Sequence, residues 1–378
     1  MTRARFAWWL TLVSISVVAT ALYIGCGEKE EAPVASPQEQ GVVLDKSNPM
    51  IRAVMDVQDR HTAALMANPD VVGTATGTLE DGTPAILVFT KDEIEPSVLA
   101  KGTVIPSSIE GVPVVVQVTG ELRAMKGGGG VSHTAIQTPP IQLGTSGGWR
   151  YDLANGFCCG GTLGALIQKG GNQYVLSNYH VLWADIVSGG NGIVATAGDP
   201  VIQPGLIDVG CIAANAQDIA TLADAGSLPS ANVDAGYALV IPGMVSTDGA
   251  ILEVGTLSSA TTTVFVGQAV KKSGRTTGLT RSTVSGINGT VSITYDNECA
   301  GGTAFTKTFT GQVIISNRRC RFQAGGDSGS ALVEDITTNP RAVGLCYAGS
   351  VICNNSAIAI ANPINDVLAW AGATMVGQ

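Results

Sequence analysis

The chain has 378 residues, enough for two domains of ordinary size. Its 30 acidic residues outnumber its 21 lysines and arginines, and a formal net charge of −9 at pH 7 argues against nucleic acid as a partner. Only 13% of the residues are charged, 45% are hydrophobic and 48 are glycine, which excludes long disordered regions and is typical of an all-β protein with many turns.

The chain opens with a predicted export signal at residues 1–25, in which two early arginines precede a long apolar run. This run resembles a bacterial lipoprotein signal, in which a small residue precedes a cysteine that is lipidated and becomes the new N-terminus. Gly25 and Cys26 match that pattern, whereas Tyr23 stands where leucine is preferred. The resemblance implies lipidation of Cys26 and a membrane-anchored protein of the cell envelope that faces the periplasm or the extracellular side. The alternative is an uncleaved transmembrane anchor.

Residues 26–48 are rich in Glu, Pro, Ser and Gln and are predicted to form a solvated tether. A small α+β domain is then predicted over residues 49–125. It starts with a helix that Asn48 caps and that the Asn-Pro pair at residues 68–69 ends. Three strands are predicted after the helix, at residues 71–79, 85–90 and 112–118. This domain contains no recognisable Ser-His-acid set or phosphate loop.

Residues 126–148 contain a glycine run and a Pro-Pro pair with little periodicity, and they are predicted to be a linker. Residues 149–378 form the predicted second domain, in which short Val/Ile/Thr-rich runs alternate with turns, as in a β-barrel or sandwich. The predicted strands include residues 162–168, 173–177, 236–241, 291–295 and 311–316. A helical pattern at residues 363–373 closes the chain.

One glycine-rich segment has the composition of a nucleophile loop. Residues 325–330 place Ser328 among glycines, which let the backbone bend until consecutive N–H groups point at one spot that can bind an oxyanion. A serine hydroxyl is a weak nucleophile at neutral pH and needs an adjacent base, usually a histidine that a third group orients. Of the three histidines, only His180 lies in the predicted β domain, because His61 lies in the predicted helix and His133 in the linker.

Four segments of the second domain resemble the trypsin/chymotrypsin-like serine endopeptidases, specifically their bacterial branch. Residues 157–163 resemble the strand before the histidine, residues 176–181 the histidine motif, and residues 326–329, Gly-Asp-Ser-Gly, the nucleophile motif. Residues 272–280 are similar to a hairpin of the second barrel in many bacterial members. The resemblance implies an all-β double β-barrel of the chymotrypsin type with a C-terminal helix, preceded here by the small α+β domain. It also implies a serine endopeptidase that hydrolyses protein or peptide substrates without a cofactor.

The family orders its triad as His, Asp and Ser, so the acid is expected between His180 and Ser328. Asp234 precedes an apolar strand, as the family's acid does, and is our choice, with Asp208 as the alternative. In the implied mechanism Ser328 attacks the scissile carbonyl, His180 transfers its proton to the leaving amine, and Asp234 orients the imidazole. The backbone N–H groups of Gly326 and Ser328 would bind the oxyanion.

Three further residues are implied in substrate binding. Phe322 stands six residues before the nucleophile, where trypsin carries an acid, so a preference for Arg or Lys is not supported. Residues 343–349, which include Tyr347 and Gly349, resemble the strand that pairs with the substrate backbone. The basic cluster at residues 318–321 is interpreted as a solvated face rather than a site for acidic residues of substrates.

Cysteines indicate an oxidising compartment, because besides Cys26 the second domain holds seven of them. The odd number leaves at least one thiol free or paired outside the chain, and spacing does not determine the pairs. No CxxC pair occurs, so no metal site is predicted. From the resemblance we guess two bridges, Cys159–Cys211 in the first barrel and Cys346–Cys353 near the pocket.

Animal members of the family are activated when a freed Ile or Val N-terminus pairs with the acid that matches Asp327. No Ile-Val-Gly-Gly start occurs near Trp149, so we expect activity without that step. The N-terminal domain is open to two interpretations: a propeptide that assists folding or blocks the cleft, or a domain that binds a substrate or envelope component. A non-catalytic scaffold whose N-terminal domain binds a partner remains an alternative function. An esterase would use the same triad, but Ser328 does not lie in a GxSxG elbow.

Overall fold

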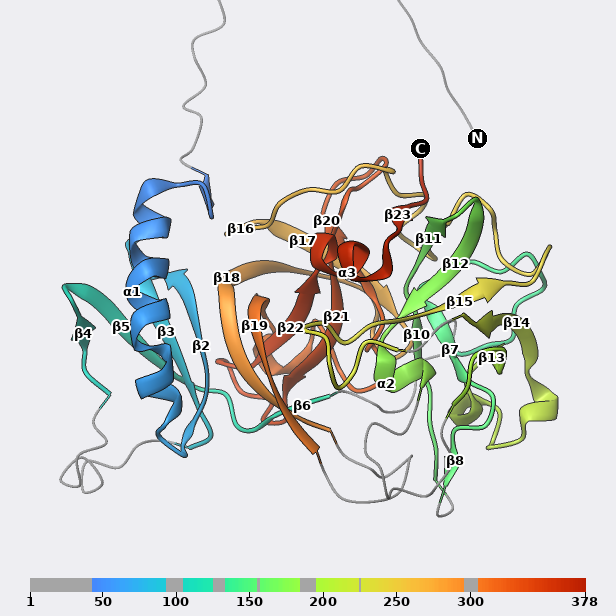
Figure 1. Ribbon diagram of the computed structural model, residues 1–378, viewed down its shortest axis with the longest axis horizontal. Coiled ribbons are helices and arrows are strands. Elements are labelled where there is room, and N and C mark those ends of the chain that lie inside the picture. The colour runs from blue at the N-terminus through green and yellow to red at the C-terminus, as the bar shows by residue number, and fades with distance from the viewer. Residues whose placement is uncertain are drawn as a thin grey trace, which may run out of the picture. The chain divides into compact units, whose positions relative to one another are not determined.

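The structure is a computed structural model that describes residues 43–92, 105–124, 133–154, 157–183, 195–223, 226–295 and 305–378 (Figure 1). The predicted signal at residues 1–25, Cys26 and the tether as far as residue 42 lie outside the described residues. Within the described ranges, none of the helices combines the length and apolar character that crossing a membrane requires.

A curled eight-stranded sheet forms the first half of the β domain. Its strand order is β10-β7-β13-β14-β15-β12-β11-β23, and neighbouring strands in it are antiparallel. The strands are β7 (Thr145–Trp149), β10 (Gly161–Leu163), β11 (Ala165–Lys169), β12 (Asn172–Ser177), β13 (Pro200–Gln203), β14 (Gln217–Leu222), β15 (Gly236–Val240) and β23 (Thr374–Met375). The core of this half includes fully buried aliphatic side chains such as Leu163, Val175 and Ile219.

A second sheet contains eleven strands, ten in the main path β17-β20-β21-β22-β19-β18-β2-β3-β5-β4 and β6 joined to it. Pairing of β17 with β18 closes six of these strands into a barrel. The barrel strands are β17 (Ala269–Gly274), β18 (Gly278–Tyr295), β19 (Phe305–Ser316), β20 (Ala331–Glu334), β21 (Ala342–Ser350) and β22 (Ile358–Pro363). The remaining strands are β2 (Val71–Thr78), β3 (Pro84–Thr90), β4 (Ser108–Ile109), β5 (Val112–Val118) and β6 (Leu122–Ala124).

Short elements complete the described chain. The helices are α1 (Pro49–Met66), α2 (Tyr179–Leu182) and α3 (Ile364–Ala371), with 3-10 turns η2 (Leu206–Asp208), η3 (Ala213–Asn215) and η4 (Arg318–Cys320). Two short ladders pair β1 (Leu44–Asp45) with β16 (Phe265–Val266) and β8 (Leu153–Ala154) with β9 (Phe157–Cys158). Hence residues 44–45 of the predicted tether form a strand.

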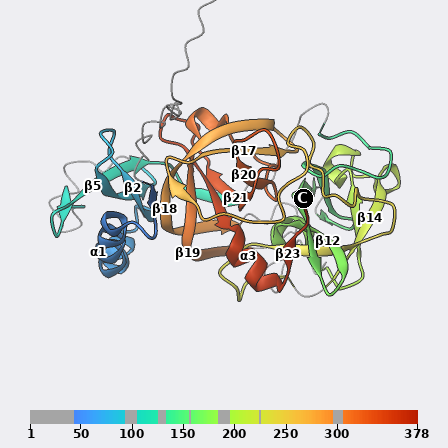
Figure 2. The ribbon, with the colours of Figure 1, turned by 90° about the horizontal axis from the view of Figure 1, so that it is seen from above.

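The N-terminal elements extend the second barrel. The α1 helix begins where Asn48 Oδ1 accepts the N–H of Met50 at 2.9 Å, and it lies beside β2 (Figure 2). It packs on β2 and β3 through apolar side chains such as Val54. Strand β2 pairs antiparallel with β18, with Gly77 opposite Gly286. The elements predicted as a separate α+β domain therefore share one sheet with the barrel.

The predicted helix, hairpin, third strand and closing helix of the chain are confirmed, as is the all-β double-barrel fold class. The predicted strand at residues 162–168 is interrupted at Gly164, a position that only glycine fits because a Cβ would collide with the carbonyl oxygen of Gly329. The predicted strand at residues 291–295 is the end of the much longer β18, and the one at residues 311–316 is the end of β19.

Residues 133–148 of the predicted linker lie against the first sheet. The N–H of Ile141 donates to Met244 O, and the N–H of Leu143 donates to Ala250 O, both at 2.9 Å. Both apolar side chains are fully buried, and β7 begins at Thr145. Low periodicity in the sequence did not indicate this packing, because the segment is held by isolated bridges rather than by a long strand.

Both guessed disulfides are wrong. Cys158, not its neighbour Cys159, bonds Cys211, and Cys320 bonds Cys353. Cys159 is engaged in a disulfide of its own. Cys346 is free and completely buried, and burial raises the pKa of its thiol to about 12. Spacing cannot separate Cys158 from Cys159, because adjacent residues differ only in the direction of their side chains.

Candidate active site

His180 lies directly after a strand of the first sheet. Strand β12 ends at Ser177, and the single-turn helix α2 carries His180, whose side chain is only 3% exposed. The Ser177 hydroxyl donates to the carbonyl of Thr162 at 2.7 Å and anchors the end of β12. The strand predicted at residues 173–177 is confirmed as part of β12, and a single helical turn after it carries His180.

Asp234 faces His180 from the segment before β15. Its Oδ2 atom lies 2.6 Å from His180 Nδ1, and its side chain is fully buried. The backbone of Asp234 is anchored on both sides, because its N–H donates to Asn362 Oδ1 at 2.9 Å and its carbonyl accepts from Asn178 Nδ2 at 2.7 Å. A buried carboxylate held in this way fixes the tautomer and orientation of an imidazole.

Asp208, the alternative acid, has other partners. Its carboxylate accepts both Nε and Nη2 of Arg275, at 2.6 and 2.5 Å, and the hydroxyl of Ser146 at 2.5 Å. The Arg275 side chain is 1% exposed, so the two residues form a bidentate pair inside the protein. Of the two candidate acids, the structure brings only Asp234 to His180.

The nucleophile loop is held against the first sheet. The carbonyl of Ser328 accepts the N–H of Thr162 at 2.8 Å, and Thr162 Oγ1 donates to the carbonyl of Gly326 at 2.9 Å. Gly329 has a φ of +93°, and a Cβ there would collide with the Thr162 carbonyl oxygen and the Ser177 hydroxyl. Only glycine fits this position. The nucleophile loop therefore lies close to Ser177, the residue that ends the strand before the histidine helix.

The hydroxyl of Ser328 donates to the carbonyl of Tyr347 at 3.1 Å. Among the described residues, the Nε2 atom of His180 is buried and makes no hydrogen bond. The bond between nucleophile and base that the mechanism requires is therefore not formed in this conformation. In structures without substrate, such catalytic hydrogen bonds are often long or poorly aligned and tighten only when the substrate binds.

The Asp327 carboxylate anchors the nucleophile loop through hydrogen bonds to backbone N–H groups. Its Oδ1 atom accepts the N–H groups of Thr276 and Thr277 at 2.9 and 3.1 Å, and its Oδ2 atom accepts that of Ala324 at 2.9 Å. Its Oδ2 atom also lies 3.3 Å from the ammonium nitrogen of Lys272, and both side chains are fully buried. The predicted oxyanion donors, the N–H groups of Gly326 and Ser328, flank this anchored residue.

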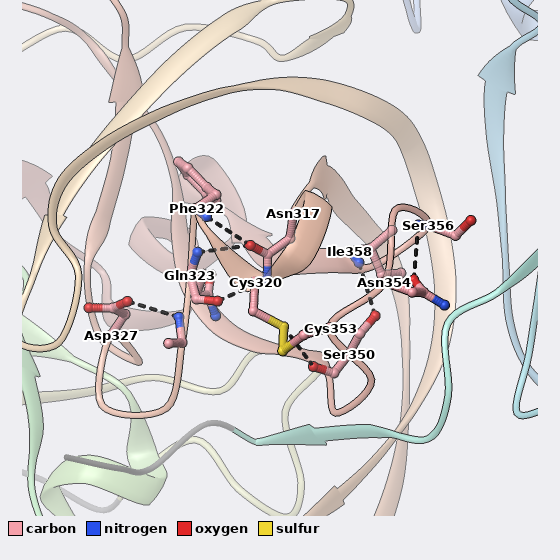
Figure 3. Close-up of a disulfide and its surroundings, with 11 residues drawn as sticks. Asn317, Cys320, Phe322, Gln323, Asp327, Ser350, Cys353, Asn354, Ser356 and Ile358 are labelled. Atoms are coloured by element: carbon pink, nitrogen blue, oxygen red, sulfur yellow. Dashed lines mark hydrogen bonds between the residues drawn. A yellow bond between two sulfur atoms is a disulfide. The ribbon is translucent and has the colours of Figure 1, made fainter. Parts of the chain in front are cut away.

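The three predicted substrate-binding residues lie in different surroundings. Phe322 is 3% exposed and packs into the core of the second barrel, while its N–H donates to Asn317 Oδ1 at 2.9 Å, as Figure 3 shows beside the Cys320–Cys353 disulfide. Tyr347 is buried with its ring 5.2 Å from that of Phe309. Gly349 lies on β21, where it pairs with a strand of the N-terminal segment.

The strand paired with β21 at this point is β6. Its residues run antiparallel to β21, with Ala124 opposite Ala348, Arg123 opposite Gly349 and Leu122 opposite Ser350. On its other side, β6 contacts β18 through Arg123 and Thr294. Strand β6 of the same chain therefore occupies the edge of β21 at which the sequence predicts that the substrate pairs.

Tyr295 and Lys272 belong to the site but were not singled out from the sequence. The hydroxyl of Tyr295 donates to Asp234 Oδ2 at 2.9 Å, and burial together with the Asp234 charge raises its pKa well above the ordinary value of 10.0. Burial lowers the pKa of Lys272 below 10.5, although Asp327 opposes this shift. For Lys272, the only signal in the sequence was a lysine in an apolar strand. No signal in the sequence pointed to Tyr295.

Comparison with known proteins agrees with the fold. Residues 233–375 match a family model described as the Nal1 C-terminal domain. Streptogrisin-A of Streptomyces griseus is 34% identical over 112 residues, 30% of this chain and 32% of that protein, so the match spans about a third of the relative's length.

Two solved structures resemble the chain. A glutamic acid specific serine protease has 22% identity, with 62% of this chain and 100% of that chain covered and a TM-score of 0.41. Protease A of Thermobifida fusca has 20% identity, with 63% and 99% covered and a TM-score of 0.41. The double-barrel fold described above is of the trypsin/chymotrypsin type, and the chain is similar in sequence to a bacterial protein, Streptogrisin-A.

Proposed function

We propose that the protein is a serine endopeptidase that hydrolyses peptide bonds through an acyl-enzyme. The observation that carries this proposal is the buried contact of 2.6 Å between His180 Nδ1 and Asp234 Oδ2, next to a glycine loop that presents Ser328. The Asp234 carboxylate leaves Nε2 of His180 as the proton acceptor, and that atom has no other partner among the described residues.

In the proposed reaction, the Ser328 hydroxyl leaves the Tyr347 carbonyl and donates to His180 Nε2. Ser328 Oγ then attacks the scissile carbonyl, His180 takes its proton, and the developing oxyanion is bound by the N–H groups of Gly326 and Ser328. His180 next protonates the leaving amine, and a water molecule hydrolyses the acyl-enzyme by the reverse sequence of proton transfers. These roles need no cofactor.

The test is labelling of the full chain, in detergent, with a fluorophosphonate probe, followed by hydrolysis of a peptide library. Ser328→Ala and His180→Ala should each abolish labelling and lower kcat by roughly 10⁶. Ser330→Ala is the matched control, because it removes a buried hydroxyl of the same loop that donates to the carbonyl of Asp327. Absence of labelling in the wild type would reject the proposal and favour the non-catalytic scaffold, and labelling with hydrolysis only of esters would favour an esterase.

We further propose that the protein is bacterial and anchored to the cell envelope through a lipid on Cys26. Support comes from the lipoprotein-like segment of the sequence and from disulfides such as Cys158–Cys211, which persist in oxidising compartments. Expression of wild type and Cys26→Ser in a bacterial host, with fractionation and metabolic labelling by a fatty acid, tests this location. Equal labelling of both forms would reject lipidation at Cys26.

A further inference from the structure

Tyr295 reaches the candidate triad from the opposite barrel. It is the last residue of β18 and is 2% exposed. Its hydroxyl donates to Asp234 Oδ2 at 2.9 Å, and its ring lies 5.8 Å from the His180 ring at an interplanar angle of 62°. Tyr295 therefore contacts both members of the buried His–Asp pair at once.

The Asp234 carboxylate needs this donor, because it has no access to water. Its Oδ2 atom receives His180 Nδ1 and the Tyr295 hydroxyl, whereas among the described residues Oδ1 receives only the N–H of His180 at 3.4 Å. An ionised carboxylate in a buried position is costly unless several donors satisfy it. Removal of the phenolic hydroxyl leaves Oδ2 with one donor and frees the carboxylate to rotate.

Neighbouring contacts hold Tyr295 in place. Its ring packs 6.5 Å from that of Phe309 on β19, and the ring of Phe309 in turn contacts Tyr347. The same hairpin bonds the segment before Asp234, since Asn232 Oδ1 accepts the N–H of Thr310 and Asn232 Nδ2 donates to the Thr310 carbonyl, both at 2.9 Å. The second barrel thus fixes both the backbone and the carboxylate of the acid loop.

We propose that Tyr295 is a positioning residue of the triad, which holds the Asp234 carboxylate in the orientation that bonds His180 Nδ1. This inference rests on the proposed peptidase function. The role is one of positioning because the Tyr295 hydroxyl acts through the Asp234 carboxylate. Its burial and the charge of Asp234 keep it protonated, and so a donor, at all pH values at which a peptidase would work.

The variant Tyr295→Phe removes the hydroxyl and retains the ring that packs on His180 and Phe309. We expect kcat to fall about tenfold with KM changed by less than about twofold, as for loss of one hydrogen bond to a charged group. We also expect the acidic limb of the kcat/KM profile to move to higher pH, since a carboxylate with one donor fewer attracts the imidazolium more strongly. The matched control is Tyr237→Phe, which removes a phenolic hydroxyl that accepts from Lys169 Nζ at 2.7 Å and does not contact Asp234. Tyr237→Phe should leave kcat and the pH profile unchanged.

A second measurement does not depend on turnover. The chain has three histidines, so an isotope-labelled imidazole spectrum of the Ser328→Ala protein is simple enough to titrate His180 directly, with and without Tyr295→Phe. A midpoint that moves upward in the double variant, together with the kinetic change, supports the role of Tyr295. An unchanged midpoint and pH profile, in an enzyme whose wild type is active, overturns it and leaves the proposed function intact. A wild type without Ser328-dependent hydrolysis removes the peptidase function and the positioning role with it.

Discussion

Lys272 Nζ lies 3.3 Å from Asp327 Oδ2, and neither side chain is exposed to solvent. Lys272 comes from β17 and also donates to the hydroxyl of Thr277 and, at 3.2 Å, to the carbonyl of Gly278. Asp327 directly precedes Ser328, so an internal cation neutralises the acid of the nucleophile loop. In animal members of the family whose bacterial branch the sequence resembles, a newly freed N-terminus does this. The pair supports our expectation that activity requires no such step.

Replacement of Lys272 by methionine should lower the free energy of unfolding by about 3–5 kcal/mol, because it leaves the Asp327 carboxylate buried without its cation. It should also slow labelling by the fluorophosphonate probe, since the oxyanion loop loses an anchor. The matched control is Lys271→Met, which loses a hydrogen bond from Nζ to the carbonyl of Ile336 and the charge attraction to Asp335, and should cost about 1 kcal/mol. Urea unfolding and labelling rates measure both effects. Equal losses in the two variants would contradict an organising role for Lys272.

Mutation should show which of the two candidate residues, Asp234 or Asp208, is the catalytic acid. Asp234→Asn should preserve the fold and lower kcat by about 10⁴, because an amide no longer orients the imidazole tautomer. Asp208→Asn should instead lower the free energy of unfolding by about 3–5 kcal/mol, since it breaks the buried pair with Arg275, and should retain turnover. Steady-state kinetics and thermal unfolding check both. The reverse pattern would transfer the catalytic role to Asp208.

The pairing of β6 with β21 predicts that this segment of the chain blocks the binding of substrate to β21. Arg123→Pro removes a backbone donor from a strand that is paired on both sides and should weaken its pairing. We expect roughly tenfold faster probe labelling, which is the effect of losing one or two backbone hydrogen bonds. Arg123→Ala keeps the backbone and should label at the rate of the wild type. Unchanged labelling of the proline variant would favour the interpretation of the N-terminal elements as a binding domain.

His133 predicts an acid-dependent loss of stability. Its Nε2 atom lies 2.9 Å from the hydroxyl of Ser273 and 3.1 Å from Glu253 Oε2, and burial lowers its pKa below the ordinary 6.5 even though Glu253 opposes the shift. The unfolded chain then takes up its proton at a higher pH than the folded chain. Stability is therefore fully present above about pH 6.5 and is lost as the pH falls through 6.5 toward the lowered value.

The measurement is urea unfolding of wild type and His133→Gln from about pH 7.5 to about pH 5. Part of the acid decline should disappear in His133→Gln. The control is His61→Gln, because His61 is exposed beside Glu110. An identical slope for wild type and His133→Gln would exclude His133 as the source of the decline.

Local patterns in the sequence were sufficient for several parts of the structure. An asparagine cap followed by proline and helical apolar spacing predicted α1, and alternating apolar runs predicted the β2–β3 hairpin and several barrel strands. The motifs around His180 and Ser328 identified the two ends of the candidate site. These features depend on residues within a few positions of one another, so they can be predicted from the sequence without the tertiary structure.

Contacts between distant segments were decided by tertiary structure alone. The pairing of β2 with β18, the choice of Cys158 over Cys159, and the contact of Tyr295 with Asp234 each join residues more than 50 positions apart. Nothing near Tyr295 in the sequence marks it, because its role comes from the strand β18 carrying it across to the other barrel. Periodicity specifies which face of a strand is buried, whereas register and barrel closure specify which residues meet inside.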